Sequence, residues 1–174
     1  MRFITITISV IFILGVLTTR AIDVKVSSER INELDSLGPK EKVMSAKNIK
    51  SDLEWKNLLS QEQFRVLREK GTEMPFTGKL WNNEEKGDYY CAGCGQFLFE
   101  SDTKFESGCG WPSFYDVSNS ENIITKDDNS LGMHRIEVMC NGCDGHLGHV
   151  FEDGPEPTGL RYCINSAAMT FKKK

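Results

Sequence analysis

The pattern of hydrophobic and polar positions divides the chain into four parts. An apolar run extends from Phe3 to Leu17, and residues 22–50 then mix charged and polar residues without a single aromatic one. Residues 51–71 carry two helix-start motifs. Residues 74–171 alternate short aromatic and β-branched runs with turn clusters such as NNEEKGD and EDGPEPTG. This pattern predicts a mainly β domain of antiparallel strands, preceded by short helices.

The helices are predicted from the motifs SDLE and SQEQ, which begin at Ser51 and Ser60. Both have the spacing of a capping box, in which the serine and the acidic or amide side chain three residues later cap each other's backbone N–H. We expect helices over 52–59 and 61–70, the second of which ends at Gly71. Four apolar residues are expected to pack on the following strands: Leu53, Leu58, Phe64 and Leu67.

The apolar run at the N-terminus has the layout of a secretory signal peptide. Arg2 precedes it, the run is 15 residues long, and Thr19 and Ala21 are small residues where a signal peptidase cleaves. A membrane-spanning helix needs about 20 apolar residues, so a retained anchor is the second interpretation. We therefore expect a signal peptide over 1–21, a linker over 22–50 with too little apolar surface for a core, and export through the secretory pathway to a periplasmic or extracellular compartment.

Charge and length narrow the function classes. The chain has 21 basic and 25 acidic residues, which give a formal net charge of −4, so no basic surface for nucleic acid is expected. Its 174 residues, 39% of them hydrophobic, are typical of one soluble globular domain with extra length. A domain of this size can bury a core without disulfides.

Two CxxC motifs supply four of the six cysteines: Cys91 and Cys94 in CAGC, and Cys140 and Cys143 in CNGC. Glycine in or beside each motif allows a tight turn that points backbone amides at the sulfurs. Two such turns are typical of a structural Zn²⁺ site, which is tetrahedral and leaves no position for water. The alternative is a disulfide framework, because exported proteins favour disulfides and six cysteines allow many pairings.

Cys163 has no cysteine near it in the sequence. If residues 160–165 form a strand, the apolar side chains point to one face, and Arg161, Cys163 and Asn165 point to the other. A guanidinium lowers the pKa of a nearby thiol, and the thiolate is the reactive form. An inert buried cysteine is the usual alternative for a lone cysteine, but the polar neighbours favour a reactive one.

The segment HVFED supplies a second polar face: His149, Phe151 and Asp153. A turn over 154–159 would fold it back antiparallel to the Cys163 strand. Opposite charges prefer to lie across from each other in such a hairpin. The resulting register pairs Asp153 with Arg161, Phe151 with Cys163, and His149 with Asn165.

The three histidines differ in what their positions predict. His149 shares the face of Cys163, which favours proton transfer over a structural role. His146 lies in a glycine-rich turn, so strand parity does not fix its direction. His134, in GMHRIEV, is expected to be structural.

A flexible segment carries the sixth cysteine. Glycines flank Cys109 in SGCGW, and the loop should therefore be able to bring it to another sulfur. Trp111 offers an apolar plate that suits a small methyl-bearing group, with a core aromatic as the alternative.

Together, PFTGKLW, CAGCG, FESGCGWPSF, CNGCDGHLGHVFEDGP and GLRYCINSAAMTF resemble the methionine-R-sulfoxide reductase family, methionine sulfoxide reductase B. The resemblance covers about residues 52–172 in order, and it implies a reductase domain over 51–174. The implied fold has two antiparallel sheets, the β-tent, with N-terminal helices and one structural Zn²⁺. The implied activity is reduction of the R epimer of methionine sulfoxide, free or in peptides, by an enzyme that a thioredoxin-like reductant recycles. We expect the enzyme to be a monomer.

The resemblance also implies a role for each candidate residue. Cys163 is the nucleophile, and Cys109 resolves its sulfenic acid to a disulfide, which a dithiol then reduces by exchange. The groups that bind and protonate the sulfoxide oxygen are His149, His146 and Asn165. Trp111 and Phe151 form the methyl pocket, and Arg161 and Asp153 tune the thiol.

Two other functions fit parts of the pattern. A zinc-ribbon module that binds protein or nucleic acid would use the CxxC motifs, but the acidic charge and Cys163 disfavour it. A general disulfide oxidoreductase would place its reactive pair in one CxxC near a helix start. Alkylation distinguishes the three, because the reductase should have one fast-reacting thiol outside the metal site.

Overall fold

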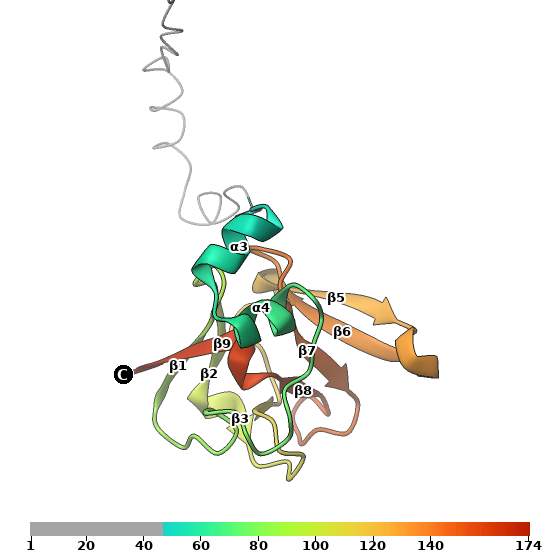
Figure 1. Ribbon diagram of the computed structural model, residues 1–174. Helices are drawn as coiled ribbons and strands as arrows, with labels where there is room; N and C mark the ends of the chain where they lie inside the picture. The colour runs from blue at the N-terminus through green and yellow to red at the C-terminus, as the bar shows by residue number, and fades with distance from the viewer. Residues whose placement is uncertain (1–46) are drawn as a thin grey trace, which may run out of the picture. The chain divides into compact units, whose positions relative to one another are not determined.

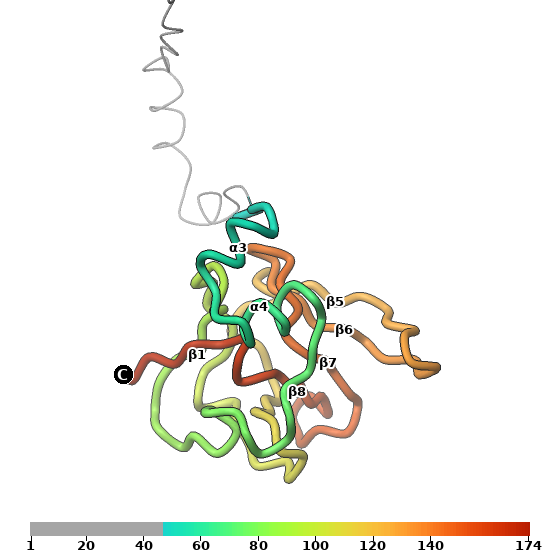
Figure 2. Tube along the Cα trace, viewed as in Figure 1, coloured from blue at the N-terminus to red at the C-terminus, as the bar shows by residue number. Residues whose placement is uncertain are grey.

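A computed structural model describes residues 47–174 of the chain (Figures 1 and 2). The expected signal peptide over 1–21, and most of the expected linker, lie outside the described residues. Within residues 47–174, no helix is both long and apolar enough to cross a membrane. The end of the expected linker contacts the domain, since Lys47 Nζ lies 2.7 Å from Asp144 Oδ1.

Both predicted helices form, and each begins with its predicted capping box. They are α3 (Asp52–Leu58) and α4 (Gln61–Leu67), each slightly shorter than expected. The Ser51 hydroxyl accepts from the Glu54 N–H at 3.4 Å, and the Glu54 carboxylate accepts from the Ser51 N–H at 2.8 Å. The second helix repeats this arrangement.

The buried face of α3 differs from the predicted one. Leu53 and Leu58 are 71% and 62% exposed, so their predicted burial was wrong. They are five residues apart, which places them on different sides of a helix with 3.6 residues per turn. Trp55 and Leu59, four residues apart and on one side, are buried instead. The two residues predicted for α4 are buried as expected: Phe64 and Leu67.

The strands form two antiparallel sheets, which confirms the predicted fold class. The smaller sheet has the order β2-β1-β9, with β1 (Gly87–Cys91), β2 (Phe97–Glu100) and β9 (Met169–Lys173). The larger has the order β3-β4-β8-β7-β6-β5. Its strands are β3 (Lys104–Phe105), β4 (Ser113–Phe114), β5 (Ile123–Asp128), β6 (Arg135–Cys140), β7 (His146–Phe151) and β8 (Arg161–Ile164). In Figure 1, β5 and β6 form a long hairpin that extends away from the rest of the domain.

An aromatic cluster joins the two sheets. Phe99 of β2 stacks on Phe114 of β4 with ring centroids 4.3 Å apart, and Tyr89 of β1 meets Phe114 edge-on at 5.0 Å. All three side chains are fully buried, and burying each contributes about 1.5–3 kcal/mol to stability. Because β4 pairs with β8, this cluster also fixes the strand that carries Cys163.

The hairpin of β7 and β8 forms, but its predicted register was wrong by two residues. The Cα partners are His149 with Cys163 and Phe151 with Arg161. Asp153 lies beyond the end of β7, and its carboxylate still accepts two hydrogen bonds from Arg161, at 2.8 and 2.9 Å. The arginine side chain is long enough to reach a partner two residues away, so the ion pair does not set the register. A shift of two keeps the faces unchanged, and it brings His149 directly opposite Cys163.

Candidate active site

The four CxxC cysteines converge at one point between the two sheets. Their sulfurs all lie within 4.8 Å of one another, with Cys91 3.7 Å from Cys143 and Cys94 3.5 Å from Cys140. All four are free cysteines, which contradicts a disulfide framework. A tetrahedron with Zn–S bonds of about 2.3 Å has sulfur–sulfur edges of about 3.8 Å. The donor set and its spacing therefore fit a structural Zn²⁺.

The fold explains why glycine lies inside the second motif. A Cβ on Gly142 would lie 3.0 Å from the Cys94 sulfur, closer than side chains normally approach. Cys91 ends β1 of the small sheet, and Cys140 ends β6 of the large sheet. A metal bound here would consequently tie the two sheets together.

The remaining two cysteines lie beside each other. Cys163 is on β8, Cys109 is in the loop before β4, and their sulfurs are 3.7 Å apart. Gly108 and Gly110, which flank Cys109, have φ values of 71° and 88°, a conformation that other residues rarely adopt. A disulfide has an S–S distance of about 2.05 Å, so a shift of about 1.7 Å in the loop would close the bond.

The pKa of Cys163 is raised, whereas the neighbouring Arg161 in the sequence indicated a lowered one. Burial, together with the neighbouring Cys109, raises the pKa of Cys163 to about 12, and the Arg161 guanidinium lowers it only in part. Burial also opposes ionisation of Cys109, but hydrogen bonds from Ser107 and Ser113 outweigh it and lower its pKa. The resting protein therefore holds Cys163 as a thiol rather than as an activated thiolate.

A small pocket of about 130 Å³ opens beside Cys163. Its lining brings together five of the residues predicted for the site: Trp111, His149, Phe151, Cys163 and Asn165. The other lining residues are Thr72, Arg135 and Gly148. The Arg161 guanidinium lies 4.5 Å from the centre of the Phe151 ring. Arg161 thus supports a pocket wall as well as acting on the thiol.

Glu73 holds two sides of this pocket in place. Its carbonyl accepts from Trp111 Nε1 at 3.1 Å, and its N–H donates to Asn165 Oδ1 at 3.0 Å. Its buried carboxylate accepts from the N–H groups of Ser166 and Ala167, at 2.6 and 2.9 Å. The Asn165 amide also donates to the Leu147 carbonyl, so its orientation is fixed at both ends.

The predicted histidines His149 and His146 lie side by side, with ring centroids 5.4 Å apart. In a regular strand, successive side chains alternate between the two faces of the sheet, so residues three apart, such as His146 and His149, would point to opposite faces. An irregularity in the pairing of β6 with β7, between His146 and Gly148, brings the rings together, as bulges near active sites often do. His134 is exposed on the β5–β6 hairpin, 3.4 Å from Asp127.

His149 is held by the carboxylate of Asp128, the last residue of β5, beside the turn of the same hairpin. Its Nε2 lies 2.8 Å from Asp128 Oδ2, and Arg135 donates to the same oxygen at 2.7 Å. Hydrogen bonds from Ser130 and His149 keep the pKa of Asp128 well below its usual range. Asp128 therefore stays ionised and fixes the orientation of the imidazole.

Comparison with known proteins then decides the family. A family model described as the SelR domain matches residues 59–173. The peptide methionine sulfoxide reductase MsrB of Methanosarcina mazei is 63% identical over 125 residues, which cover 72% of this chain and 89% of that protein. The proteins of the same name from Leptospira interrogans and Thiobacillus denitrificans are 59% and 53% identical over 125 and 131 residues. These matches cover 72% and 75% of this chain, and 95% and 99% of those proteins.

The chain belongs to the methionine sulfoxide reductase B family. The match confirms the resemblance found in the sequence motifs, and the zinc-ribbon module and the general disulfide oxidoreductase are set aside. In this family member, the site contains three acidic residues that were not predicted: Glu73, Asp128 and Glu137, the last with its Oε1 2.8 Å from His146 Nδ1. Only Asp128 has a local signal, because it pairs with Arg135 across the β5–β6 turn.

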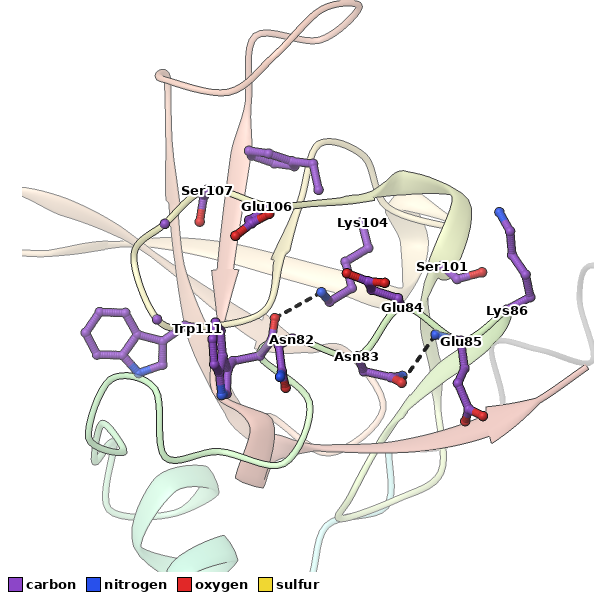
Figure 3. Close-up of a pocket in the computed structure, with 14 residues that line it drawn as sticks. Asn82, Asn83, Glu84, Glu85, Lys86, Ser101, Lys104, Glu106, Ser107 and Trp111 are labelled. Atoms are coloured by element: carbon purple, nitrogen blue, oxygen red, sulfur yellow. Dashed lines mark hydrogen bonds between the residues drawn. The ribbon is translucent and has the colours of Figure 1, made fainter.

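Figure 3 shows a second hollow of this methionine sulfoxide reductase B chain, of about 320 Å³, beside the Cys109 loop. Gly108 and Gly110 line it, and Trp111 borders both hollows. Lys104 crosses it to donate to the Trp81 carbonyl at 3.0 Å. The charged residues of its lining are Glu84, Glu85, Lys86, Lys104 and Glu106. The groove therefore lies against the glycines on both sides of Cys109.

Proposed function

We propose that the protein reduces the R epimer of methionine sulfoxide, free or in peptides, to methionine, with Cys163 as the nucleophile. The observation that carries the proposal is the pair of sulfurs 3.7 Å apart beside a pocket lined by Trp111 and Phe151. Membership of the methionine sulfoxide reductase B family supports the substrate. The named relatives are peptide methionine sulfoxide reductases.

In the first step, the Cys163 sulfur attacks the sulfoxide sulfur. The S–O bond breaks, the oxygen passes to Cys163 as a sulfenic acid, and methionine leaves. The sulfoxide gains the two electrons that Cys163 loses. Cys163 loses its thiol proton, and the sulfenic acid that forms carries one proton on its oxygen. The step therefore neither takes up nor releases a net proton.

His149 is proposed to donate the proton to the oxygen. It lies directly opposite Cys163 in the β7–β8 pairing, where facing side chains are about 4.5–5.5 Å apart at Cβ. Asp128 orients its ring. Asn165 lines the same pocket, and one N–H of its amide is free to bind the oxygen after its bond to Leu147 is made.

In the second step, Cys109 attacks the sulfenic sulfur, water leaves, and a Cys163–Cys109 disulfide forms. The lowered pKa of Cys109 suits this role, because the thiolate is the attacking form. A thioredoxin-like dithiol then reduces the disulfide through a mixed disulfide. The groove beside the Cys109 loop offers room for the segment of a protein reductant that must reach this sulfur.

The selection of one epimer is proposed to come from the pocket walls. If the methyl group of the substrate lies against Trp111 and Phe151, the sulfoxide oxygen must point toward the histidines for Cys163 to meet the sulfur. Only one configuration at sulfur satisfies the three contacts together. The opposite epimer would turn its oxygen toward an apolar wall, where it has no hydrogen-bond partner.

The metal and the N-terminal segment complete the proposal. Cys91, Cys94, Cys140 and Cys143 would hold one structural Zn²⁺, and the redox steps do not pass through it. The first 21 residues would direct the chain into the secretory pathway. The mature enzyme would act there as a monomer.

The test is an assay of the purified mature protein with separated R and S epimers of methionine sulfoxide and dithiothreitol as reductant. We expect methionine from the R epimer alone, and none from either epimer with the Cys163→Ser variant. Comparable turnover of both epimers would contradict the proposal. So would full activity of the variant.

A further inference from the structure

The backbone of one residue holds two walls of the Cys163 pocket that differ in chemistry. The N–H of Glu73 donates to Asn165 Oδ1 at 3.0 Å, and the carbonyl of the same residue accepts from Trp111 Nε1 at 3.1 Å. Both partners line the pocket. Trp111 offers an apolar ring and Asn165 a polar amide, so the position of the Glu73 backbone sets the separation of the two surfaces.

The Glu73 N–H also fixes which way the Asn165 amide faces. An amide side chain carries an acceptor oxygen and a donor nitrogen of similar size. Here the oxygen accepts from Glu73, and Nδ2 donates to the Leu147 carbonyl at 2.9 Å. A flipped amide would place its NH₂ group against the Glu73 N–H and its oxygen against the Leu147 carbonyl. Both hydrogen bonds would be lost, so the amide keeps its orientation as long as the Glu73 backbone stays in place.

The side chain of Glu73 anchors this backbone to the segment that follows β8. Its two carboxylate oxygens accept from the N–H groups of Ser166 and Ala167, at 2.6 and 2.9 Å, at the start of the short helix η4 (Ser166–Ala168). Glu73 is only 6% exposed, so water cannot readily replace these bonds. Because both oxygens are acceptors, an amide at this position could make only one of the two bonds.

Glu73 belongs to a strap, defined here as residues 72–80, which contains no helix or strand. In Figure 2 the strap follows α4 and passes the labels of β7 and β8. The Phe76 N–H donates to the Gly110 carbonyl at 2.8 Å, which ties the strap to the Cys109 loop. A Cβ on Gly78 would lie 2.5 Å from Glu73 Oε1, closer than side chains normally approach. The anchor therefore leaves no room for a larger residue at position 78.

We propose that Glu73 is a positioning residue that sets the width of the substrate pocket and so selects a methyl sulfoxide over larger ones. The inference rests on the proposed function. The carboxylate holds the Glu73 backbone, and the backbone holds the Trp111 ring and the Asn165 amide at a fixed separation. A sulfoxide fits when its methyl group meets the first surface while its oxygen meets the second. A larger group on sulfur needs the two surfaces further apart.

The experiment compares kcat/KM for the R epimers of methionine sulfoxide and ethionine sulfoxide, which differ by one CH₂ group on sulfur, with dithiothreitol as reductant. Sulfoxide and reductant react in separate half-reactions, so kcat/KM for the sulfoxide reports the first one alone. One methylene in a fitted pocket is worth about 10–200-fold, and we expect the unsubstituted protein to prefer methionine sulfoxide at least about tenfold.

Glu73→Gln keeps one acceptor oxygen of the anchor and loses the other. Loss of one hydrogen bond predicts a decrease of about 3–10-fold in kcat/KM for methionine sulfoxide, mainly through a higher KM. The preference over ethionine sulfoxide should fall toward one, because the two surfaces are then free to move apart.

Gly78→Ala tests the same anchor without changing a residue that lines the pocket. The added Cβ should push the Glu73 carboxylate away from the N–H groups of Ser166 and Ala167, and the preference should fall as in Glu73→Gln. This variant decides the question if Glu73→Gln does not fold. The matched control is Leu98→Val, in the buried core on β2. It should lower the thermal midpoint and leave the preference unchanged, which separates lost stability from lost positioning.

Proton–nitrogen NMR of the Trp111 indole supplies a readout that needs no substrate. We expect its N–H to exchange slowly with solvent in the unsubstituted protein, because it donates to the Glu73 carbonyl. Exchange should be faster in Glu73→Gln and Gly78→Ala, but not in Leu98→Val.

Three results would overturn the inference: an unchanged substrate preference in Glu73→Gln, unchanged exchange of the Trp111 N–H in that variant, or an equal loss of preference in Leu98→Val. If the unsubstituted protein forms no methionine, the proposed function fails and the positioning role fails with it. Normal turnover by the unsubstituted protein, together with an unchanged preference in Glu73→Gln, defeats this inference alone.

Discussion

Replacing Cys109 with alanine should make the Cys163 thiol more acidic. Burial is the largest cause that raises the pKa of Cys163, and the next two are the charge and the hydrogen bond of Cys109. Both of these disappear in Cys109→Ala. The Arg161 guanidinium, which lowers the pKa, then acts against burial alone.

The size of the effect follows from the pKa of about 12 for Cys163. At pH 8, about 1 thiol in 10⁴ is then ionised, compared with about a quarter for an unfolded cysteine with a pKa near 8.5. Native Cys163 should therefore alkylate about 10³-fold more slowly than the same residue in the unfolded chain. Each unit by which Cys109→Ala lowers the pKa should raise the rate about tenfold at this pH.

The assay is iodoacetamide labelling followed by peptide mass spectrometry, which resolves Cys163 from the other cysteines. The pH dependence of the rate reports the pKa, because limited access of the reagent slows the reaction equally at every pH. Cys109→Ser is the matched control; it keeps a hydrogen-bonding group and removes the negative charge, so its rate should be intermediate. The reasoning would be refuted if native Cys163 reacted at pH 8 as fast as an unfolded cysteine, or if Cys109→Ala left the pH profile unchanged.

Two further predictions concern the metal site and the acid. Serine in place of Cys91 or Cys143 should lower both the zinc content and the thermal midpoint, because a closed four-sulfur site contributes to folding; disulfides and an absence of zinc in the unsubstituted protein would contradict this. His149→Ala should slow methionine formation about 10²–10⁴-fold, as expected when a proton donor is lost, and should leave the alkylation rate of Cys163 unchanged. An unchanged rate at all pH values would remove His149 from the mechanism.

The features that could be predicted from the sequence are those that depend on near neighbours in the chain. The capping box of Ser51 and Glu54 is local, and it formed as predicted. The CxxC motifs each fix two sulfurs within one turn, so the four-cysteine cluster could be anticipated. Strand parity placed Arg161, Cys163 and Asn165 on one face without knowledge of the partner strand.

The register of β7 and β8 could not be predicted from the sequence. Opposite charges indicated a direct pairing of Asp153 with Arg161, yet their ion pair forms between positions two residues out of register. Long side chains tolerate such offsets, whereas the backbone hydrogen bonds do not. Parity still held, because an offset of two leaves each side chain on its face.

The acidic residues of the site were missed for a different reason. Glu137 meets Lys70 across 67 residues of sequence, and the Glu73 carboxylate meets Ser166 across 93. Such contacts depend on which strands become neighbours, and no local pattern encodes that order. The thiol acidity of Cys163 was also misjudged, because the charge of Arg161 is visible in the sequence but the depth of burial is not.

The central claim is that Cys163 takes the oxygen and Cys109 resolves the product. Its most direct measurement uses the Cys109→Ser variant with excess R-methionine sulfoxide and no reductant, and it counts methionine per protein while peptide mass spectrometry follows Cys163. The account predicts one equivalent of methionine and one added oxygen on Cys163, with no turnover when thioredoxin is supplied. Absence of methionine, an oxygen on another residue, or full thioredoxin-driven turnover would contradict it.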